Sequence, residues 1–113
     1  MTFIFPIPPS VNHAWGRTRS GMMFVTKEGL AFRKAVALIV GGVSFSPKSR
    51  LTVTIALHFD KKYRCDIDNR IKSLLDACQH AGLFEDDNQV DALHVFRMES
   101  VKGGKCVVDI ETL

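Results

Sequence analysis

Two carboxylates stand one residue apart in the segment RCDIDNRIKSLLD at positions 64–76. In an extended segment, side chains at positions i and i+2 point to the same side, so Asp66 and Asp68 can aim at one point in space. Two bare carboxylates would repel each other, and a bound cation removes that repulsion. Mg²⁺ takes hard oxygen ligands, commonly one or two carboxylates completed by water and phosphate. The segment therefore predicts a metal site, with a helix cap and polar turn as the alternative interpretation.

A second acidic segment, FEDDNQVD at 84–91, contributes Glu85, Asp86, Asp87 and Asp91. If the strand that follows it lies beside the strand ending at Phe59, Asp86 or Asp87 is expected to approach the first pair of acids. Three or four carboxylates would then hold one or two metal ions. Two such ions about 3.5–4 Å apart are a common arrangement for in-line attack on a phosphate.

Basic residues surround the first acidic pair and suggest a phosphate-containing partner. Lys72 follows Asp68 by four residues, one helical turn later, where it can hold a phosphate or stabilise the charge of a transition state. The alternative for Lys72 is an exposed ion pair of small energy. Contacts that neutralise DNA phosphates release counterions and give salt-sensitive affinity, although a solvated charge run would look the same. The candidate DNA-binding residues are Lys61, Lys62, Arg64, Arg70, Arg17 and Arg19.

The elements that must position these residues can be traced along the chain. TFIFPI at 2–7 predicts an opening strand, and residues 9–23 lack apolar periodicity and predict a loop. In that loop Trp15 either faces a partner or packs on the core. The period-two alternation from Leu51 to Phe59 predicts a strand with one buried face.

Two helices are expected between and after these strands. The first begins at the N-cap Thr26 and ends at the glycine pair 41–42, with its core-facing stripe at Leu30, Ala31, Ala35, Leu38 and Ile39. The second has Asp68 as its N-cap and Gly82 as its stop. QVDALHVFRMES at 89–100 predicts a strand, VKGG a hairpin turn, and KCVVDIETL at 105–113 the closing strand. The order βαβαββ predicts an α+β fold, a single domain over 1–113 with a mixed sheet of about four strands packed with two helices.

Composition narrows the class of protein. A chain of 113 residues with a net charge of +3 is one mildly basic domain, which permits a polyanionic partner. Three cysteines without C-x-x-C spacing indicate a reducing compartment rather than a disulfide framework or a zinc site. Since no apolar run reaches about 18 residues, we expect no membrane span and a cytoplasmic location. The sequence contains no Walker-type phosphate loop and no nucleophile elbow.

Four stretches resemble the RusA family of Holliday junction resolvases, in the same order and at similar spacing. They are PPSVN at 8–12, TKEGLAFR at 26–33, DIDNRIKSLLDAC at 66–78 and AGLFEDDNQV at 81–90. The specific element is D-x-D-N-x-x-K followed by G-x-x-x-D-D-x-Q-V. One departure is the basic run before the first aspartate, which Tyr63 and Cys65 interrupt.

The resemblance implies a small homodimeric, Mg²⁺-dependent endonuclease of bacteria, phages or prophages. Its catalytic carboxylates correspond to Asp66, Asp68 and Asp87, its essential lysine to Lys72, and Asp86 is implied as an accessory metal ligand. Asn69 and Gln89 are implied to orient the site. The expected reaction is paired hydrolysis at a four-way DNA junction in the bacterial host cytoplasm, with Mg²⁺ as cofactor and Mn²⁺ able to replace it. A branched-DNA-binding module without catalysis and a metal-dependent hydrolase of small phosphate esters are the alternatives.

Overall fold

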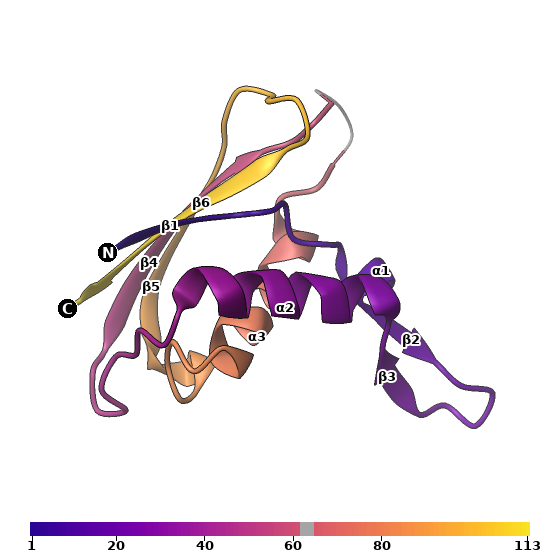
Figure 1. The fold of residues 1–113 in the computed structure, drawn as a ribbon, viewed down its shortest axis with the longest axis horizontal. Helices are drawn as coiled ribbons and strands as arrows, with labels where there is room; N and C mark the ends of the chain where they lie inside the picture. Colours follow the sequence, from indigo (N-terminus) through magenta and orange to yellow (C-terminus); the bar gives the residue numbers. More distant parts are fainter. Residues whose placement is uncertain (62–64) are drawn as a thin grey trace.

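Strand β4 (Leu51–His58) lies in the interior of a four-stranded sheet and supplies the centre of the core. The predicted alternation is confirmed, because Leu51, Val53, Ile55 and Leu57 are fully buried whereas the threonines between them are only partly covered. These side chains pack into one apolar cluster with helices α2 (Lys27–Val40) and α3 (Ile71–His80). The computed structural model, which describes residues 1–61 and 65–113, thus has a sheet with both long helices against one face (Figure 1).

The strand order of this sheet is β1-β6-β4-β5. Strand β6 (Lys105–Thr112) runs antiparallel to β4 on one side and to β1 (Thr2–Phe5) on the other. Strand β5 (Val90–Arg97) runs parallel to β4 and forms an edge of the sheet. The chain therefore returns to the start of β4 before β5 begins, and helix α3 makes this crossover.

The predicted hairpin at VKGG is wrong. Strand β4 lies between β5 and β6, so the segment 98–104 crosses the end of β4 instead of joining neighbouring strands. Two backbone hydrogen bonds hold it there, from Met98 N–H to the Leu57 carbonyl at 2.9 Å and from Val101 N–H to the Phe59 carbonyl at 3.0 Å. VKGG does form a tight turn, closed by a hydrogen bond from Gly104 N–H to the Val101 carbonyl at 2.9 Å, but this turn lies within the crossing segment; both glycines have positive φ.

Helix α2 begins and ends where the sequence predicts. The Thr26 hydroxyl accepts a hydrogen bond from Gly29 N–H at 3.1 Å, and Gly41 ends the helix in the left-handed conformation with φ of 59°. The predicted core stripe is wrong, since Leu38 is 83% exposed and Leu30 and Ile39 are also exposed. The buried stripe is one position away, at Gly29, Phe32, Val36 and Val40.

The segment predicted as a loop contains regular structure. A short helix α1 (Val11–Ala14) leads into β2 (Trp15–Arg17), which pairs antiparallel with β3 (Met23–Val25) as a separate two-stranded sheet. This hairpin projects away from the main sheet, beyond the N-terminal end of α2 (Figure 1). Two single 3₁₀ turns complete the described residues, η1 (Asp68–Arg70) before α3 and η2 (Asp87–Gln89) before β5.

The predicted α+β class and the four-stranded mixed sheet are confirmed, and the described residues form three α-helices where the sequence predicted two. Among the described residues, none of the helices has both the length and the apolar character needed to cross a bilayer.

Candidate metal and nucleic-acid site

Asp66 and Asp68 lie between the end of β4 and the start of α3, and both are exposed. Within residues 1–61 and 65–113, their carboxylates form no hydrogen bond or ion pair. The prediction that Asp68 caps the helix is wrong, because Asp68 lies inside η1 and the N-cap of α3 is Arg70. The carboxylates are therefore not used by the helix that they precede.

The start of α3 is tied to the PPS segment near the N-terminus. The buried Ser73 hydroxyl donates to the Pro9 carbonyl, and the Arg70 guanidinium donates to the Pro8 carbonyl at 2.9 Å. Arg70 also lies 5.4 Å from the centroid of the Phe59 ring. These contacts fix the position of the acidic pair, and they give Arg70 an internal role beside its predicted contact with DNA.

Lys72 is exposed, and its Nζ lies 5.9 Å from the centroid of the Trp15 ring. The alternative of an ion pair with Asp68 is not seen among the described residues. Trp15 is half-buried and lines an open groove beside Lys72, and a contact of its indole with a partner stays a prediction. Among the described residues the Lys72 ammonium thus contacts the Trp15 ring but no carboxylate.

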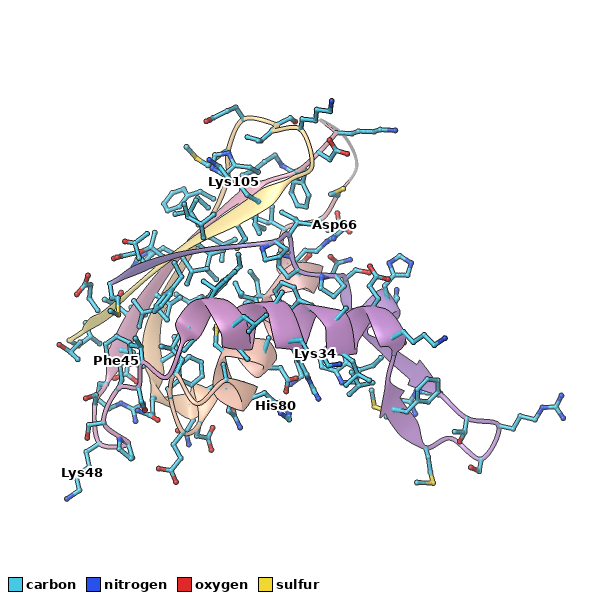
Figure 2. The ribbon with its side chains drawn as sticks, in the orientation of Figure 1. Lys34, Phe45, Lys48, Asp66, His80 and Lys105 are labelled. Carbon is cyan, nitrogen blue, oxygen red and sulfur yellow. The ribbon has the colours of Figure 1, made fainter. Side chains whose placement is uncertain are left out.

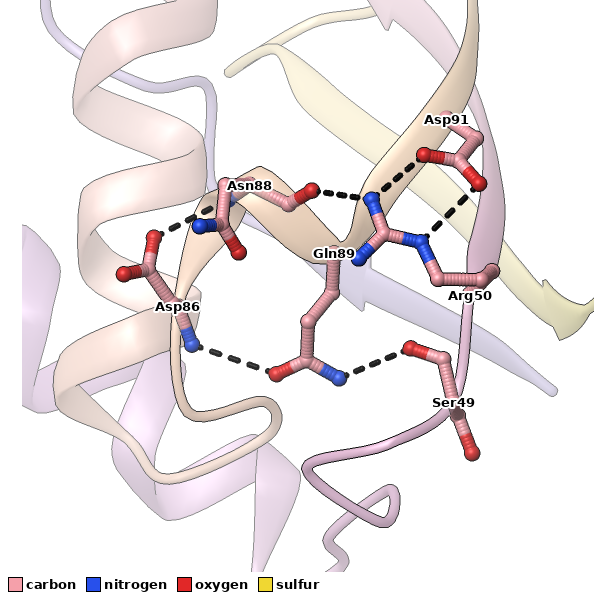
Figure 3. A network of polar contacts seen from close by, with 6 residues as sticks. All are labelled: Ser49, Arg50, Asp86, Asn88, Gln89 and Asp91. Atoms are coloured by element: carbon pink, nitrogen blue, oxygen red, sulfur yellow. Dashed lines mark hydrogen bonds and ion pairs between the residues drawn. The ribbon is translucent and has the colours of Figure 1, made fainter.

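The second acidic segment is organised by one buried side chain, Gln89, which is 2% exposed (Figure 3). Its Oε1 accepts from Glu85 N–H at 3.0 Å and Asp86 N–H at 3.2 Å. Its Nε2 donates to the carbonyls of Ser46 at 3.0 Å and Ser49 at 2.9 Å. The carboxylate of Asp86 caps η2 by accepting from the backbone N–H of the second residue after it, at 3.0 Å.

The other acids of this segment have different environments. The Asp87 backbone N–H donates to Oε1 of Gln79, in the last turn of α3, at 3.1 Å, and the Asp87 side chain is half-buried. Asp91 accepts from the guanidinium of Arg50 at 2.5 and 3.0 Å (Figure 3). These hydrogen bonds hold the pKa of Asp91 below its usual value. Asp91 is therefore already paired, whereas the carboxylate of Asp87 has no partner within residues 1–61 and 65–113.

The two acidic segments lie at opposite ends of α3. From Asp68 to Gln79 the chain advances eleven residues, about 16 Å at the α-helical rise. Asp66 and His80, at the two ends of the helix, are likewise far apart in Figure 2. In the part of the chain that the structure describes, no three acidic, histidine or cysteine side chains are close enough to hold one metal ion.

The expected approach of Asp86 or Asp87 to the first pair therefore does not occur within one chain. The physical reason is strand direction. Strand β5 does lie beside β4, but it runs parallel, so the acids before β5 lie beside the start of β4 and not beside its end. The assignment of Asp66, Asp68, Asp86 and Asp87 as metal ligands stays a prediction.

The first pair by itself fits a hard divalent cation. Two exposed carboxylates without protein partners among the described residues supply oxygen ligands of the kind that Mg²⁺ prefers, with water and phosphate completing the shell. The neighbouring Asn69 has a buried Oδ1 with no hydrogen-bond partner in the same residues, so this oxygen keeps an unused acceptor position beside Asp68.

The predicted DNA-binding residues are spread over two regions. Arg17 and Arg19 are exposed on the β2–β3 hairpin, and the Arg17 guanidinium donates to the Gly21 carbonyl at 3.4 Å. Lys61 is exposed after β4, whereas Lys62 and Arg64 lie outside the described residues. Their contacts with DNA stay predictions.

Comparison with known proteins identifies the family. The family model described as Endodeoxyribonuclease RusA matches residues 6–111. This chain belongs to the RusA family. It is 36% identical to the crossover junction endodeoxyribonuclease rusA of Enterobacteria phage HK97, over 98% of this chain and 93% of that protein. The proteins of the same name from Enterobacteria phage 82 and from Escherichia coli are each 35% identical over 93% of this chain and 88% of theirs.

One ion pair near this candidate site was not predicted from the sequence. The Arg33 guanidinium donates to Asp76 at 2.6 Å, which joins α2 to α3 beneath the Trp15 groove. Asp76 follows Lys72 by one helical turn, and this i,i+4 spacing was the signal that could have placed it beside the lysine.

Proposed function

We propose that this chain resolves four-way DNA junctions by Mg²⁺-dependent paired hydrolysis of phosphodiester bonds. Family membership carries the proposal, since relatives that match nearly the whole chain are named crossover junction endodeoxyribonucleases. Those relatives come from enterobacterial phages and from Escherichia coli, which supports action in the cytoplasm of a bacterial host. The residues corresponding to the family's acids and lysine are all present.

The proposed roles follow from chemistry and exposure. Asp66 and Asp68 would hold the cation, and Mn²⁺ should replace Mg²⁺ because both accept carboxylate and water oxygens. A bound divalent cation supplies charge neutralisation at the phosphate and lowers the pKa of a coordinated water. The Lys72 ammonium, one turn into α3, would bind a non-bridging phosphate oxygen and stabilise its growing charge. In the reaction a water molecule loses a proton as its oxygen bonds to phosphorus, one P–O ester bond breaks, and the departing oxygen gains a proton.

We further propose that the third acid comes from a second copy of the chain. Asp68 and Asp87 lie at the two ends of α3, so two copies of this helix packed antiparallel about a two-fold axis would bring Asp68 of one chain near Asp87 of the other. An isologous dimer forms such contacts in symmetric pairs. It would create two equivalent sites, which matches the two opposed strands that must be cut in a junction.

The first test is cleavage of a synthetic four-way junction, with linear duplex and nucleotides as parallel substrates, in Mg²⁺ or in EDTA. The proposal expects symmetric paired nicks in the junction alone, lost in EDTA and lost in Asp68→Asn, with junction binding by that variant largely kept. Tight binding without cutting by the wild-type chain would indicate a binding module. Release of phosphate from nucleotides would indicate a small-ester hydrolase.

The second test distinguishes shared sites from sites within one chain. Asp68→Asn and Asp87→Asn should each be inactive alone. In a mixed dimer of the two variants, shared sites would leave one site fully intact, so mixing should restore single nicks. If all three acids act within one chain, every site in the mixture lacks one acid and cutting stays absent. An Asp68→Asn protein mixed with Asp66→Asn is the matched control, since both variants damage the same half of the site.

A further inference from the structure

A groove separates the β2–β3 hairpin from α3 beside the proposed catalytic lysine. Its volume is about 360 Å³. Aromatic and aliphatic side chains form most of its wall, and one ammonium and one carboxylate face it. The lining residues are Val11, Trp15, Met23, Phe24, Val25, Lys72 and Asp76.

The two aromatic residues of the groove are held by the hairpin itself. Trp15 and Phe24 come from paired strands, with Trp15 opposite Val25 and Gly16 opposite Phe24. The Phe24 ring lies against the bare backbone of Gly16, where a Cβ would come within 2.5 Å of ring atom Cζ. About half of the Phe24 side chain nevertheless remains exposed. The hairpin thus presents aromatic surface without burying it in the core.

The charges around the groove favour a polyanion that carries flat rings. Lys72 stands 5.9 Å from the Trp15 ring centroid, a separation of less than two base steps of about 3.4 Å. Arg17 lies two residues after the groove residue Trp15 on β2 and is exposed. Asp76 is neutralised by Arg33 at 2.6 Å, so its carboxylate can accept a hydrogen bond without leaving an unpaired negative charge beside a phosphate.

We propose that this groove binds a nucleobase displaced from the helical stack, next to the phosphate that Lys72 contacts. The proposal rests on the proposed function and adds a base-binding subsite to it. Stacking of a base on an aromatic side chain tolerates any base, because every base has a π-face. The Trp15 indole is the stacking platform, and Phe24 closes the side of the groove away from α3.

Such a subsite would favour junctions over linear duplex. Drawing a base out of a continuous helix requires unstacking and unpairing, and this requirement is least where the stack is already interrupted. Bases at a branch point have lost a stacking neighbour on one side. The groove would therefore fill readily at a junction and rarely on duplex DNA, even where phosphate contacts are equal.

The chain contains a single tryptophan, so its fluorescence reports on the groove alone. In the experiment, a four-way junction and a linear duplex of the same sequence are each titrated into Asp68→Asn protein, which should leave the DNA uncut. Gel shift measures binding in parallel. We expect saturating junction to quench or shift Trp15 emission at least about twice as much as saturating duplex does. Unchanged emission at full junction occupancy would overturn the proposal. So would an emission change that depends on protein concentration without DNA, since a second copy would then cover the groove.

Substitutions provide an independent readout. Trp15→Leu should lower the rate of junction cutting about tenfold or more, in line with the loss of one stacked base, whereas Trp15→Phe should stay within about threefold of wild type. Phe96→Leu is the matched control, because Phe96 is a half-exposed aromatic residue on edge strand β5, outside the groove. The affinity for linear duplex should change by less than about twofold in all three variants.

These outcomes separate the subsite from the nuclease activity. If wild type does not cut junctions, the proposed function fails. If wild type cuts and folded Trp15→Leu cuts as fast as Phe96→Leu, only the base-binding subsite fails. Thermal melts of each variant establish folding, and the emission experiment needs no change at Trp15.

Discussion

Gln89 is the side chain whose removal should most disturb the second acidic segment. It is buried and makes four hydrogen bonds to backbone groups, two as acceptor and two as donor. Gln89→Leu replaces the amide with an apolar side chain that is one bond shorter, and it leaves two N–H groups and two carbonyls without their partner. The variant should therefore lose stability and also loosen the loop that carries Asp87.

The expected loss of stability in Gln89→Leu follows from the number of hydrogen bonds that are removed. Each neutral hydrogen bond contributes about 0.5–1.5 kcal/mol net, so four bonds give roughly 2–6 kcal/mol. The loop backbone lies near the surface, where water can replace some partners, and we therefore expect about 2–4 kcal/mol. For a domain of this size, this loss should lower Tm by about 8–16 °C.

Urea unfolding and thermal melts measure this loss, and Gln79→Leu is the matched control. Gln79 is an exposed glutamine whose Oε1 accepts a single hydrogen bond, from Asp87 N–H, so its loss should stay below about 1 kcal/mol. Gln89→Glu adds a pH test, because its carboxylate would face two carbonyl oxygens. Its folded pKa should rise above about 4.3, so its stability deficit should shrink as pH falls. Equal small losses for the Gln89 and Gln79 variants would refute the reasoning.

Three further predictions concern the rest of the molecule. Gly29→Ala should lower the free energy of unfolding in urea by about 1–3 kcal/mol, because the new Cβ would come within 2.5 Å of a backbone carbonyl oxygen of α1. Alanine favours helices over glycine, so a gain in stability would contradict this packing. Burial raises the pKa of Cys78 and of Cys106 to about 12, so thiol reagents at pH 8 should label only the partly exposed Cys65 before unfolding. Because Arg50 lowers the pKa of Asp91, this pair should stabilise the fold above about pH 4 and cease to do so as pH falls through the lowered value. NMR titration should show a higher Asp91 pKa in Arg50→Gln.

The sequence predicted the elements better than their pairing. The alternation over 51–59 has one physical solution, a strand with its apolar face buried, and β4 confirms it. The pattern of β5 is equally compatible with parallel and antiparallel neighbours, and Gly103-Gly104 resembles a hairpin turn. The crossover helix between β4 and β5 is what makes the pair parallel, and this consequence of topology separates Asp68 from Asp87.

Helix caps were predictable from the sequence, because each cap depends only on residues within one turn of it. Thr26 and Gly41 cap α2 because their own dihedral angles and the nearest N–H groups suffice. The choice of the buried face was not predictable in this way, since α2 carries apolar residues all round and only its partners select Phe32 over Leu38. The strands of the β2–β3 hairpin span three residues each, too short for a period to be read.

The length of α3 has a consequence for when the protein can act. If each active site needs Asp68 from one chain and Asp87 from another, a newly synthesised monomer has no complete active site. Nuclease activity would then rise with the square of protein concentration until dimers saturate. At low protein concentration the chromosome would not be nicked, and junctions would be resolved only once the concentration approaches the dissociation constant of the dimer.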